Sequence, residues 1–226
     1  TSLIKVFLVT CADQTEDIVS YIKEVAARDA KKEILLGMDC EGLNISKPLS
    51  LMQMYFEGNT YIFDLLSHNP FEAGLKEILE NNNYIKIFHD FCEDAAAILR
   101  QYKVKIAGVF DTQIAHREYA KQEHTYCYKD SNISLNSLLQ KYLNTENAMK
   151  SEISDEMSAN NDFWEQRPLS REMIEYASQD VVYLPSMYAI FKKQMRKASL
   201  TEIFDKSSNC HFYSLINKNH PGISFC

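Results

Sequence analysis

Residues 34–43 constrain the possible folds more than any other part of the chain. They read Ile-Leu-Leu-Gly-Met-Asp-Cys-Glu-Gly-Leu and begin as an unbroken apolar run. A run of this kind is typical of a β-strand that is covered on both faces, as in sheets that carry helices on either side. With 226 residues, the chain is long enough for one domain with a substantial core. We therefore expect this strand at the centre of an α/β domain.

Two carboxylates, Asp39 and Glu41, follow the apolar run at positions i and i+2. Because successive side chains of a strand alternate between faces, both project to the same side. Two acids held side by side at the end of a buried strand repel each other and lose hydration, and a bound cation compensates for both costs. The same pair also arises by chance at solvated strand ends, so its meaning depends on the rest of the sequence.

The remaining hydrophobic pattern predicts a mixed sheet. Further strands are expected at 5–9, 50–56, 60–64, 84–88 and 109–110, with a hairpin turn at 57–59. Helices are expected over 13–28, 70–81, 90–102, 135–143 and 170–196, with one more from Asp111 or Thr112, and Pro185 bends or divides the last. Residues 120–132, 144–162 and 199–226 lack a clear period, and no regular element is predicted there. Strands that first follow one another and then alternate with helices indicate the α/β class.

Composition limits the class of protein. No apolar run approaches the roughly 18–20 residues of a membrane-spanning helix, so we expect a soluble intracellular protein, in the cytoplasm or nucleus, without membrane contact. The six cysteines include no Cys-x-x-Cys pair and are interpreted as reduced thiols. The net charge of −7 argues against a broad electrostatic grip on duplex DNA, although an acidic site filled with cations would still bind phosphate.

Two distant motifs carry further acids. His89-Asp90-Phe91-Cys92-Glu93-Asp94 follows the strand at 84–88, and Tyr176 precedes Asp180 by four residues, which places both on one side of a helix. If these segments meet Asp39 and Glu41, four carboxylates and one phenol form a single cluster. Carboxylate oxygens suit Mg²⁺ or Mn²⁺ better than Zn²⁺. Two such ions, roughly 3.5–4 Å apart, clamp the attacking and leaving oxygens in phosphodiester hydrolysis.

The three motifs, in this order and spacing, resemble the DEDD superfamily of 3′–5′ exonucleases, in the subclass that carries tyrosine in its last motif. Arg167-Pro168-Leu169-Ser170, followed by Met173, Tyr176-Ala177, Asp180-Val181 and Leu184, is similar to the closing segment of the RNase D branch. The first two motifs are similar to the relatives of Egalitarian and the exonuclease 3′–5′ domain-containing proteins. The resemblance covers roughly residues 34–195. It implies a ribonuclease H-like fold, a central mixed sheet of five to six strands flanked by helices. We expect the exonuclease domain at 1–200 and a C-terminal extension at 201–226, packed on the domain or trailing from it.

The resemblance also implies a role for each acid. Asp39 would bridge two divalent metal ions, Mg²⁺ or Mn²⁺. Glu41 and Asp180 would bind the ion on the nucleophile side, and Asp94 would hold the second ion through water. Tyr176 would position the hydrolytic water.

Some of these residues have alternative interpretations. Glu93 competes with Asp94, but neighbours on a helix point about 100° apart, so only one can face the site, and the family spacing from His89 selects Asp94. Tyr176 could instead be a core phenol. Asp111 is interpreted as a helix cap.

Substrate contacts are expected at Gly42, Leu43, His89, Asn136 and Arg167. For Leu43 the alternative is simple core packing, and for His89 it is a structural hydrogen bond. For Asn136 and Arg167 the alternative is hydrogen bonding within loops.

The function implied is a 3′–5′ exoribonuclease that shortens single-stranded 3′ ends and releases nucleoside 5′-monophosphates. Single-stranded nucleic acid is the expected partner, because a terminal nucleotide must be unstacked to enter such a site. The preference for RNA over DNA rests on the family resemblance alone. Protein partners in an RNA-processing complex are a further expectation. The alternatives are a DNA-directed repair or proofreading exonuclease and a non-catalytic RNA-binding adaptor.

Overall fold

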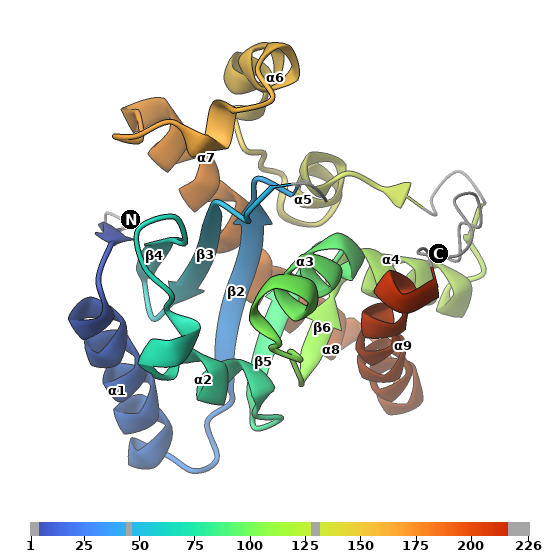
Figure 1. The fold of residues 1–226 in the computed structure, drawn as a ribbon. Helices are drawn as coiled ribbons and strands as arrows, with labels where there is room; N and C mark the ends of the chain where they lie inside the picture. Colours follow the sequence, from blue (N-terminus) through green and yellow to red (C-terminus); the bar gives the residue numbers. More distant parts are fainter. Residues whose placement is uncertain (1–4, 44–46, 128–131, 217–226) are drawn as a thin grey trace.

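The computed structural model describes residues 5–43, 47–127 and 132–216. Six strands form one sheet in the order β1-β4-β3-β2-β5-β6, as Figure 1 shows. The strands are β1 (Lys5–Val9), β2 (Ile34–Glu41), β3 (Leu51–Phe56), β4 (Asn59–Asp64), β5 (Tyr84–Phe88) and β6 (Val109–Asp111). The strand predicted from residues 34–43 is β2, and it lies inside the sheet with neighbours on both edges.

The pairing of the strands confirms the predicted mixed sheet. β2 runs antiparallel to β3, with Asp39 opposite Gln53, and parallel to β5. β3 and β4 form the expected antiparallel hairpin, while β1 joins β4 and β6 joins β5 in parallel. The C-terminal end of β2, which carries the two acids, therefore lies at the same edge as the C-terminal ends of β5 and β6.

Helices cover both faces of the sheet (Figure 1). One face carries α1 (Ala12–Arg28), the short η1 (Phe71–Leu75), α2 (Lys76–Glu80) and α3 (Cys92–Tyr102). The other face carries α7 (Arg171–Val182) and α8 (Leu184–Gln194), which divide at Pro185 as predicted, with α5 (Leu135–Leu143) packed on α8. α4 (Thr112–Gln122) and α9 (Lys197–Ile216) lie beside β6, and α6 (Lys150–Ala159) precedes η3 (Phe163–Glu165).

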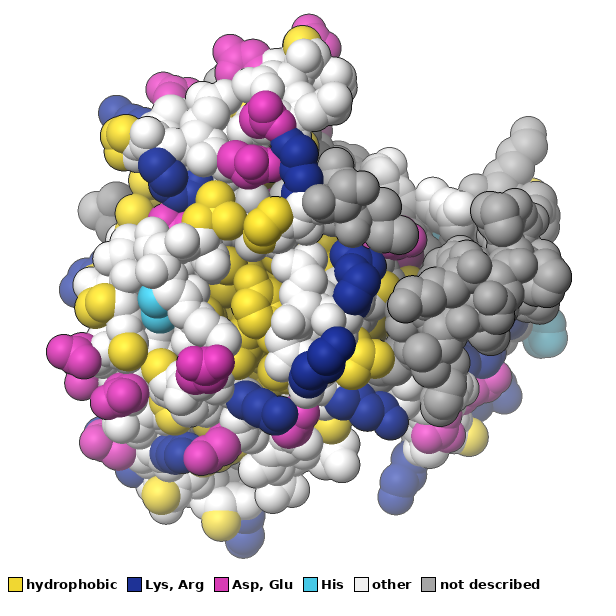
Figure 2. All heavy atoms as spheres, viewed as in Figure 1, with side chains coloured by type: hydrophobic (Ala, Val, Ile, Leu, Met, Phe, Trp, Pro, Cys, Tyr) yellow, Lys and Arg dark blue, Asp and Glu magenta, His cyan; other side chains and the backbone are white. Residues whose placement is uncertain are grey.

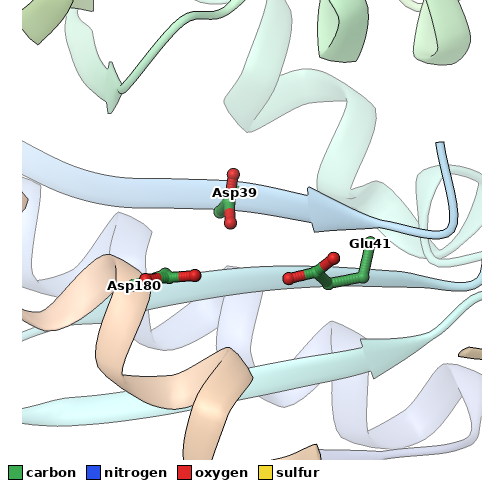
Figure 3. Close-up of side chains that lie close together, drawn as sticks. All are labelled: Asp39, Glu41 and Asp180. Atoms are coloured by element: carbon green, nitrogen blue, oxygen red, sulfur yellow. The ribbon is translucent and has the colours of Figure 1, made fainter. Parts of the chain in front are cut away.

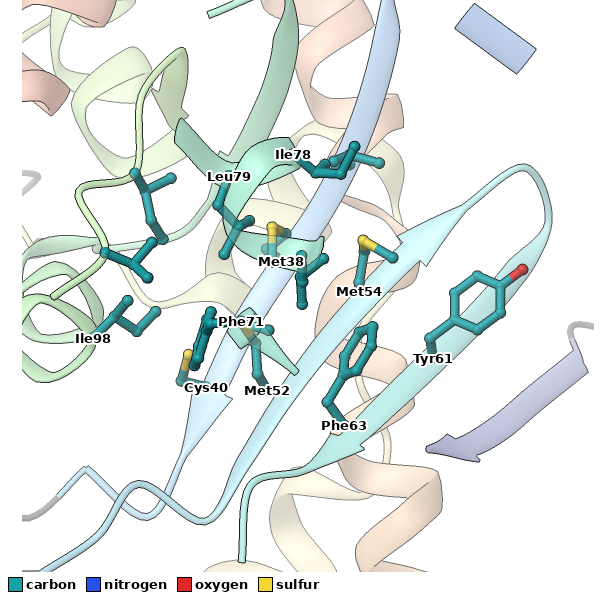
Figure 4. Close-up of a cluster of buried hydrophobic side chains, with 14 of the residues drawn as sticks. Met38, Cys40, Met52, Met54, Tyr61, Phe63, Phe71, Ile78, Leu79 and Ile98 are labelled. Atoms are coloured by element: carbon teal, nitrogen blue, oxygen red, sulfur yellow. The ribbon is translucent and has the colours of Figure 1, made fainter. Parts of the chain in front are cut away.

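The alternation of side chains along β2 separates core from site. Met38 and Cys40 point into the cluster of Figure 4, together with Met52 and Met54 of β3 and Phe63 of β4. Asp39 and Glu41 consequently project from the opposite face, where α7 lies. The apolar run thus anchors the strand so that its two acids cannot turn into the core.

Two of the weakly patterned stretches contain helices, so the expectation of irregular structure is wrong there. Within 144–162, α6 forms with only Ile153 and Met157 as an apolar pair at i and i+4. Within 199–226, α9 buries Ile203, Ser207 and Cys210, a helical stripe with a single large aliphatic member. Short polar stripes of this kind give little periodic signal. Residues 217–226 lie outside the described residues.

Hydrogen bonds as well as packing hold α9 in place. The Asp111 N–H donates to Ser207 Oγ (3.2 Å), and the Cys92 thiol donates to Cys210 Sγ (2.6 Å). The helix crosses the boundary expected at residue 200. The division into a domain and an extension stays a prediction.

The surface carries both signs of charge. On the face shown in Figure 2, Lys and Arg side chains gather along the middle, while Asp and Glu side chains are frequent toward the margins. Among the described residues, no helix combines the length and apolar character needed to span a bilayer.

Candidate active site

Three acids predicted from the sequence meet at the end of β2. Asp39 and Glu41 come from the strand and Asp180 comes from α7, with their carboxylates turned toward a common point (Figure 3). One oxygen from each lies within 4.8 Å of the others. Asp180 is 4% exposed, whereas Asp39 and Glu41 are half-buried. This spacing is close enough for one cation to contact all three.

The sequence lets α7 lie directly on β2. A Cβ atom on Gly37, two residues before Asp39 on the same face, would come within 2.4 Å of the Val181 carbonyl oxygen. Only glycine leaves room for this approach. At the other end of the helix, Ser170 Oγ accepts a hydrogen bond from the Met173 N–H (3.2 Å) and fixes the first turn. These two contacts therefore hold α7 in the position that brings Asp180 to the C-terminal end of β2.

Tyr176 lies one helical turn before Asp180 and is 8% exposed. Burial, together with the negative charges of Asp180, Glu41 and Asp39, raises the pKa of the Tyr176 phenol, which also hydrogen-bonds Asp180. The phenol therefore stays protonated at neutral pH. It can donate a hydrogen bond in the site, but it cannot act as a general base.

Asp94 approaches from the other side of β2 and is not a member of the trio. It is 3% exposed, near the start of α3, and its carboxylate is hydrogen-bonded to the Cys40 thiol. Burial and the negative charge of Asp39 raise the pKa of Asp94. The adjacent Glu93 is exposed, so Asp94 is the acid of this motif that faces inward.

The donor set fits a hard divalent cation. All candidate ligands are carboxylate oxygens, and Asp94 Oδ1 is buried without a hydrogen-bond partner among the described residues. A buried carboxylate that lacks a partner is costly, and a divalent cation supplies the missing interaction while it relieves repulsion between neighbouring acids. Asp39, Glu41, Asp180 and Asp94 are the residues that would hold the ion or ions.

A cavity of about 340 Å³ opens beside Glu41. Its walls include the Gly42–Leu43 turn on one side and Phe163 and Trp164 of η3 on the other. Gly42 has φ +80°, and a Cβ there would meet Ser50 Oγ at 2.5 Å, so the turn that shapes this wall requires glycine. Leu43 is 44% exposed, which rules out the simple core alternative. Its contact with substrate, like that of Gly42, stays a prediction.

Arg167 has a structural role at the end of β4. Its Nε and Nη2 donate to the two oxygens of Asp64, at 2.7 and 2.6 Å, and Nη1 donates to the carbonyls of Trp164 and Gln166. The guanidinium thereby ties the segment before α7 to the end of β4. These contacts are the hydrogen bonding of the alternative interpretation, and a substrate contact at Arg167 stays a prediction.

His89 and Asn136 are also occupied by structural hydrogen bonds. Both ring nitrogens of His89 are bonded, Nδ1 with Thr112 Oγ1 and Nε2 with the Ile133 carbonyl, each at 2.9 Å. The Asn136 amide donates to the Asn147 carbonyl (3.1 Å) and accepts from the Asn147 N–H (2.9 Å). These are the structural hydrogen bonds of the alternative interpretation, and substrate contacts at the two positions stay a prediction.

Sequence reasoning missed Asn147. This residue is 1% exposed, and its Nδ2 donates to Asp180 Oδ1 (2.8 Å). It lies in the aperiodic stretch 144–162, where no pattern distinguishes it from its neighbours. Asp111, in contrast, caps α4 as predicted, because its carboxylate accepts from the N–H groups of Gln113 and Ile114.

The sheet order and the acidic cluster together define a ribonuclease H-like α/β protein with a site of the exonuclease type. A family model described as 3′–5′ exonuclease matches residues 6–196. This chain therefore belongs to the 3′–5′ exonuclease family, as the resemblance of its motifs predicted.

Curated relatives point to the same branch. The chain is 28% identical to ribonuclease D of Haemophilus influenzae over 171 residues, 74% of this chain and 39% of that protein. It is also 28% identical to the human piRNA biogenesis protein EXD1 over 193 residues, 80% of this chain and 36% of that protein. The chain thus spans about two fifths of the length of these relatives.

Solved structures share the fold. The catalytic core of RRP6 from Trypanosoma brucei superposes with a TM-score of 0.73 at 20% identity, over all of this chain and 61% of that one. The Trypanosoma brucei RNase D complex with RNA U12 gives a TM-score of 0.72 at 16% identity, over 94% of this chain and 71% of that one. At these identities the likeness establishes the architecture alone.

Proposed function

We propose that this chain is a metal-dependent 3′–5′ exoribonuclease that removes nucleotides one at a time from a single-stranded 3′ end and releases nucleoside 5′-monophosphates. The observation that carries the proposal is the convergence of Asp39, Glu41 and Asp180 within 4.8 Å, with Tyr176 hydrogen-bonded to Asp180. Family membership supports the reaction class, and the oxygen-only donor set supports Mg²⁺ or Mn²⁺ as the cofactor.

The four acids would provide ligands for two cations. Asp39 belongs to the trio and its charge also acts on Asp94, so Asp39 would be the residue shared by two ions. Glu41 and Asp180 would complete one site and Asp94 the other. When bound, such ions neutralise phosphate charge and lower the pKa of coordinated water.

Tyr176 contributes orientation rather than proton abstraction. Its phenol is held protonated by burial and by the surrounding acids, and it lies against Asp180. A fixed O–H donor at this point can align the attacking water or a phosphate oxygen. Hydrogen bonds aligned in advance lower the barrier because no reorganisation is needed during the reaction.

The cavity beside Glu41 is the proposed place for the terminal nucleotide. Its volume of about 340 Å³ falls in the range of small-ligand pockets. Leu43 and Trp164 offer apolar surface there, which favours an unstacked base over a paired end. RNA is proposed over DNA because one relative is named ribonuclease D and one structural neighbour is a complex with RNA U12.

Matched oligonucleotides test the proposal directly. A 5′-labelled single-stranded RNA and the DNA of the same sequence are incubated with the protein and Mg²⁺ or Mn²⁺, and products are resolved on a gel. We expect an RNA ladder that shortens by single nucleotides, absent with chelator and in Asp39→Ala. A faster DNA ladder would indicate the repair-type alternative. RNA binding without turnover above the Asp39→Ala level would indicate an adaptor.

A further inference from the structure

Asn147 contacts the candidate site without offering it a ligand. Its side-chain Nδ2 donates to Asp180 Oδ1 at 2.8 Å and lies 3.4 Å from the Tyr176 carbonyl oxygen, which it also approaches as a donor. One amide group therefore contacts both the side chain of Asp180 and the backbone of Tyr176. It does so from outside the helix, at a residue that is 1% exposed.

The orientation of the Asn147 amide is fixed by its other partner. Its Oδ1 accepts a hydrogen bond from the Met149 N–H at 3.0 Å. If the amide were turned over, its NH₂ group would face the Met149 N–H and its oxygen would face the Asp180 carboxylate, and both contacts would be repulsive. The donor side must therefore face Asp180.

The backbone of Asn147 is fixed in turn by Asn136 of α5. The Asn136 side chain accepts from the Asn147 N–H (2.9 Å) and donates to the Asn147 carbonyl (3.1 Å). This pair of hydrogen bonds is the same that a neighbouring strand would supply, and it holds a residue that belongs to no helix or strand. A continuous chain of hydrogen bonds thus runs from α5 through Asn147 to Asp180.

We propose that Asn147 is a positioning residue for the metal site, and that Asn136 acts through it. The inference rests on the proposed function, because Asp180 must serve as a metal ligand for the contact to matter. A neutral donor is suited to this place: it orients the carboxylate without competing for the positive charge of a cation. A Lys or Arg there would neutralise Asp180 and weaken its attraction for the ion.

The predicted consequence is a loss of metal affinity that exceeds any loss of fold. Removal of a residue that orients a metal ligand costs about 10- to 100-fold in affinity or activity. We expect Asn147→Ala to weaken Mn²⁺ binding within that range. Asn136→Ala leaves the Asn147 amide in place and should weaken binding by a smaller factor.

Asn69 provides a matched control elsewhere in the chain. Its Oδ1 accepts from the N–H two residues ahead (Phe71, 3.1 Å), and its Nδ2 donates to the Glu72 carboxylate (2.9 Å), which reproduces the local pattern of Asn147 away from the acids. Asn69→Ala should lower thermal stability in the absence of metal and leave the Mn²⁺ affinity unchanged.

The experiment is a calorimetric Mn²⁺ titration of the wild-type protein and the three variants, with circular dichroism to verify folding. Nucleotide release is then measured at rising Mn²⁺ concentration. A positioning role predicts that high Mn²⁺ restores part of kcat in Asn147→Ala, whereas a purely structural defect would not respond to metal. If Asn147→Ala does not fold, Asn136→Ala carries the test.

The outcomes separate the two proposals. Wild-type protein that binds Mn²⁺, with the folded Asn147→Ala variant binding it equally well, overturns the positioning role and leaves the proposed function standing. The positioning role is overturned in the same way if Asn136→Ala has to carry the test and binds Mn²⁺ as wild type does. Wild-type protein that binds no Mn²⁺ overturns the proposed function, and the positioning role with it.

Discussion

Two groups of acids, at the ends of β4 and β2 in the same sheet, differ in how their negative charge is compensated. Asp64 ends β4, is 3% exposed in its side chain, and forms a bidentate ion pair with Arg167. Burial opposes ionisation of Asp64, but hydrogen bonds from Arg167 and Ser67 outweigh it and lower the pKa of this carboxyl group. At the end of β2, Asp39 and Glu41 face Asp180, and Asp94 has its pKa raised by burial and by the charge of Asp39.

The difference separates structural acids from candidate functional ones. Asp64 has a cation supplied by the chain itself, so its charge contributes to stability. The β2 cluster gathers several acids, and within the described part of the chain Asp94 Oδ1 is buried without a hydrogen-bond partner, which is unfavourable until an external cation binds. Substitutions in the Asp64–Arg167 pair should therefore lower stability. Substitutions in the β2 cluster should lower activity without lowering stability in the absence of metal.

The largest effect is expected for Asp180→Asn. The substitution keeps the shape of the side chain and removes a charged ligand from the trio. Because several kcal/mol of transition-state stabilisation are lost, nucleotide release should fall by about 1,000-fold or more. The free energy of unfolding without metal should not decrease. The measurement is single-turnover release from a labelled RNA, and an unchanged rate would overturn the assignment of the site.

At the Asp64–Arg167 pair, in contrast, Arg167→Met should lower the free energy of unfolding. It leaves Asp64 buried beside an apolar side chain, and loss of one partner from a fully buried pair costs about 3–5 kcal/mol. Because the Arg167 side chain is 26% exposed, we expect a smaller loss of unfolding free energy, about 2–3 kcal/mol, in urea unfolding at pH 7. Arg167→Lys, which keeps the charge but not the bidentate geometry, is the control and should lose less.

The pH dependence of that difference has a definite sign. The pKa of Asp64 is lowered in the folded state, so its stabilising contribution is present above the unfolded value of about 3.9 and disappears as pH falls through the folded value. The gap between wild type and Arg167→Met should therefore shrink between pH 5 and pH 3. A gap that stays constant would show that packing, not charge, is lost.

Strong patterns made much of the fold and the principal acids predictable. The apolar run of β2, the Gly58 hairpin and the i, i+4 spacing of Tyr176 and Asp180 are local signals, and the structure confirms each of these elements. The meeting of β2 with α7 is not local. It was expected because the motifs resembled a known family, and the contact at Gly37 supplies its physical basis.

The missed features depend on single contacts rather than periodicity. Asn147 acts through hydrogen bonds to residues 11 and 33 positions away. The partner of Arg167 lies 103 positions away. An arginine or asparagine in a polar loop has the same local sequence signal whether it binds substrate or a distant carboxylate, so only the fold distinguishes the two.

An intermediate effect is expected for Tyr176→Phe. The variant loses a hydrogen-bond donor next to Asp180 but no metal ligand. A hydrogen bond to a charged group contributes about 1.5–3 kcal/mol, so turnover should slow by about 10- to 100-fold while Mn²⁺ affinity is kept. Steady-state release at saturating Mn²⁺, paired with a calorimetric titration, separates the two quantities. Loss of metal binding would instead make the phenol part of the metal site.

The smallest effect is expected for Asp94→Asn, and its sign is the most informative. Without metal, the variant removes a buried carboxyl group whose ionisation is disfavoured next to Asp39, and stability should rise by about 1 kcal/mol, a gain typical of substitutions that relieve a strained functional site. With Mn²⁺, the order should reverse, because a ligand present at about 100 times its dissociation constant stabilises the wild type by about 2.7 kcal/mol. Thermal unfolding with and without Mn²⁺ measures both. A variant less stable than wild type in both conditions would show that Asp94, like Asp64, stabilises the fold.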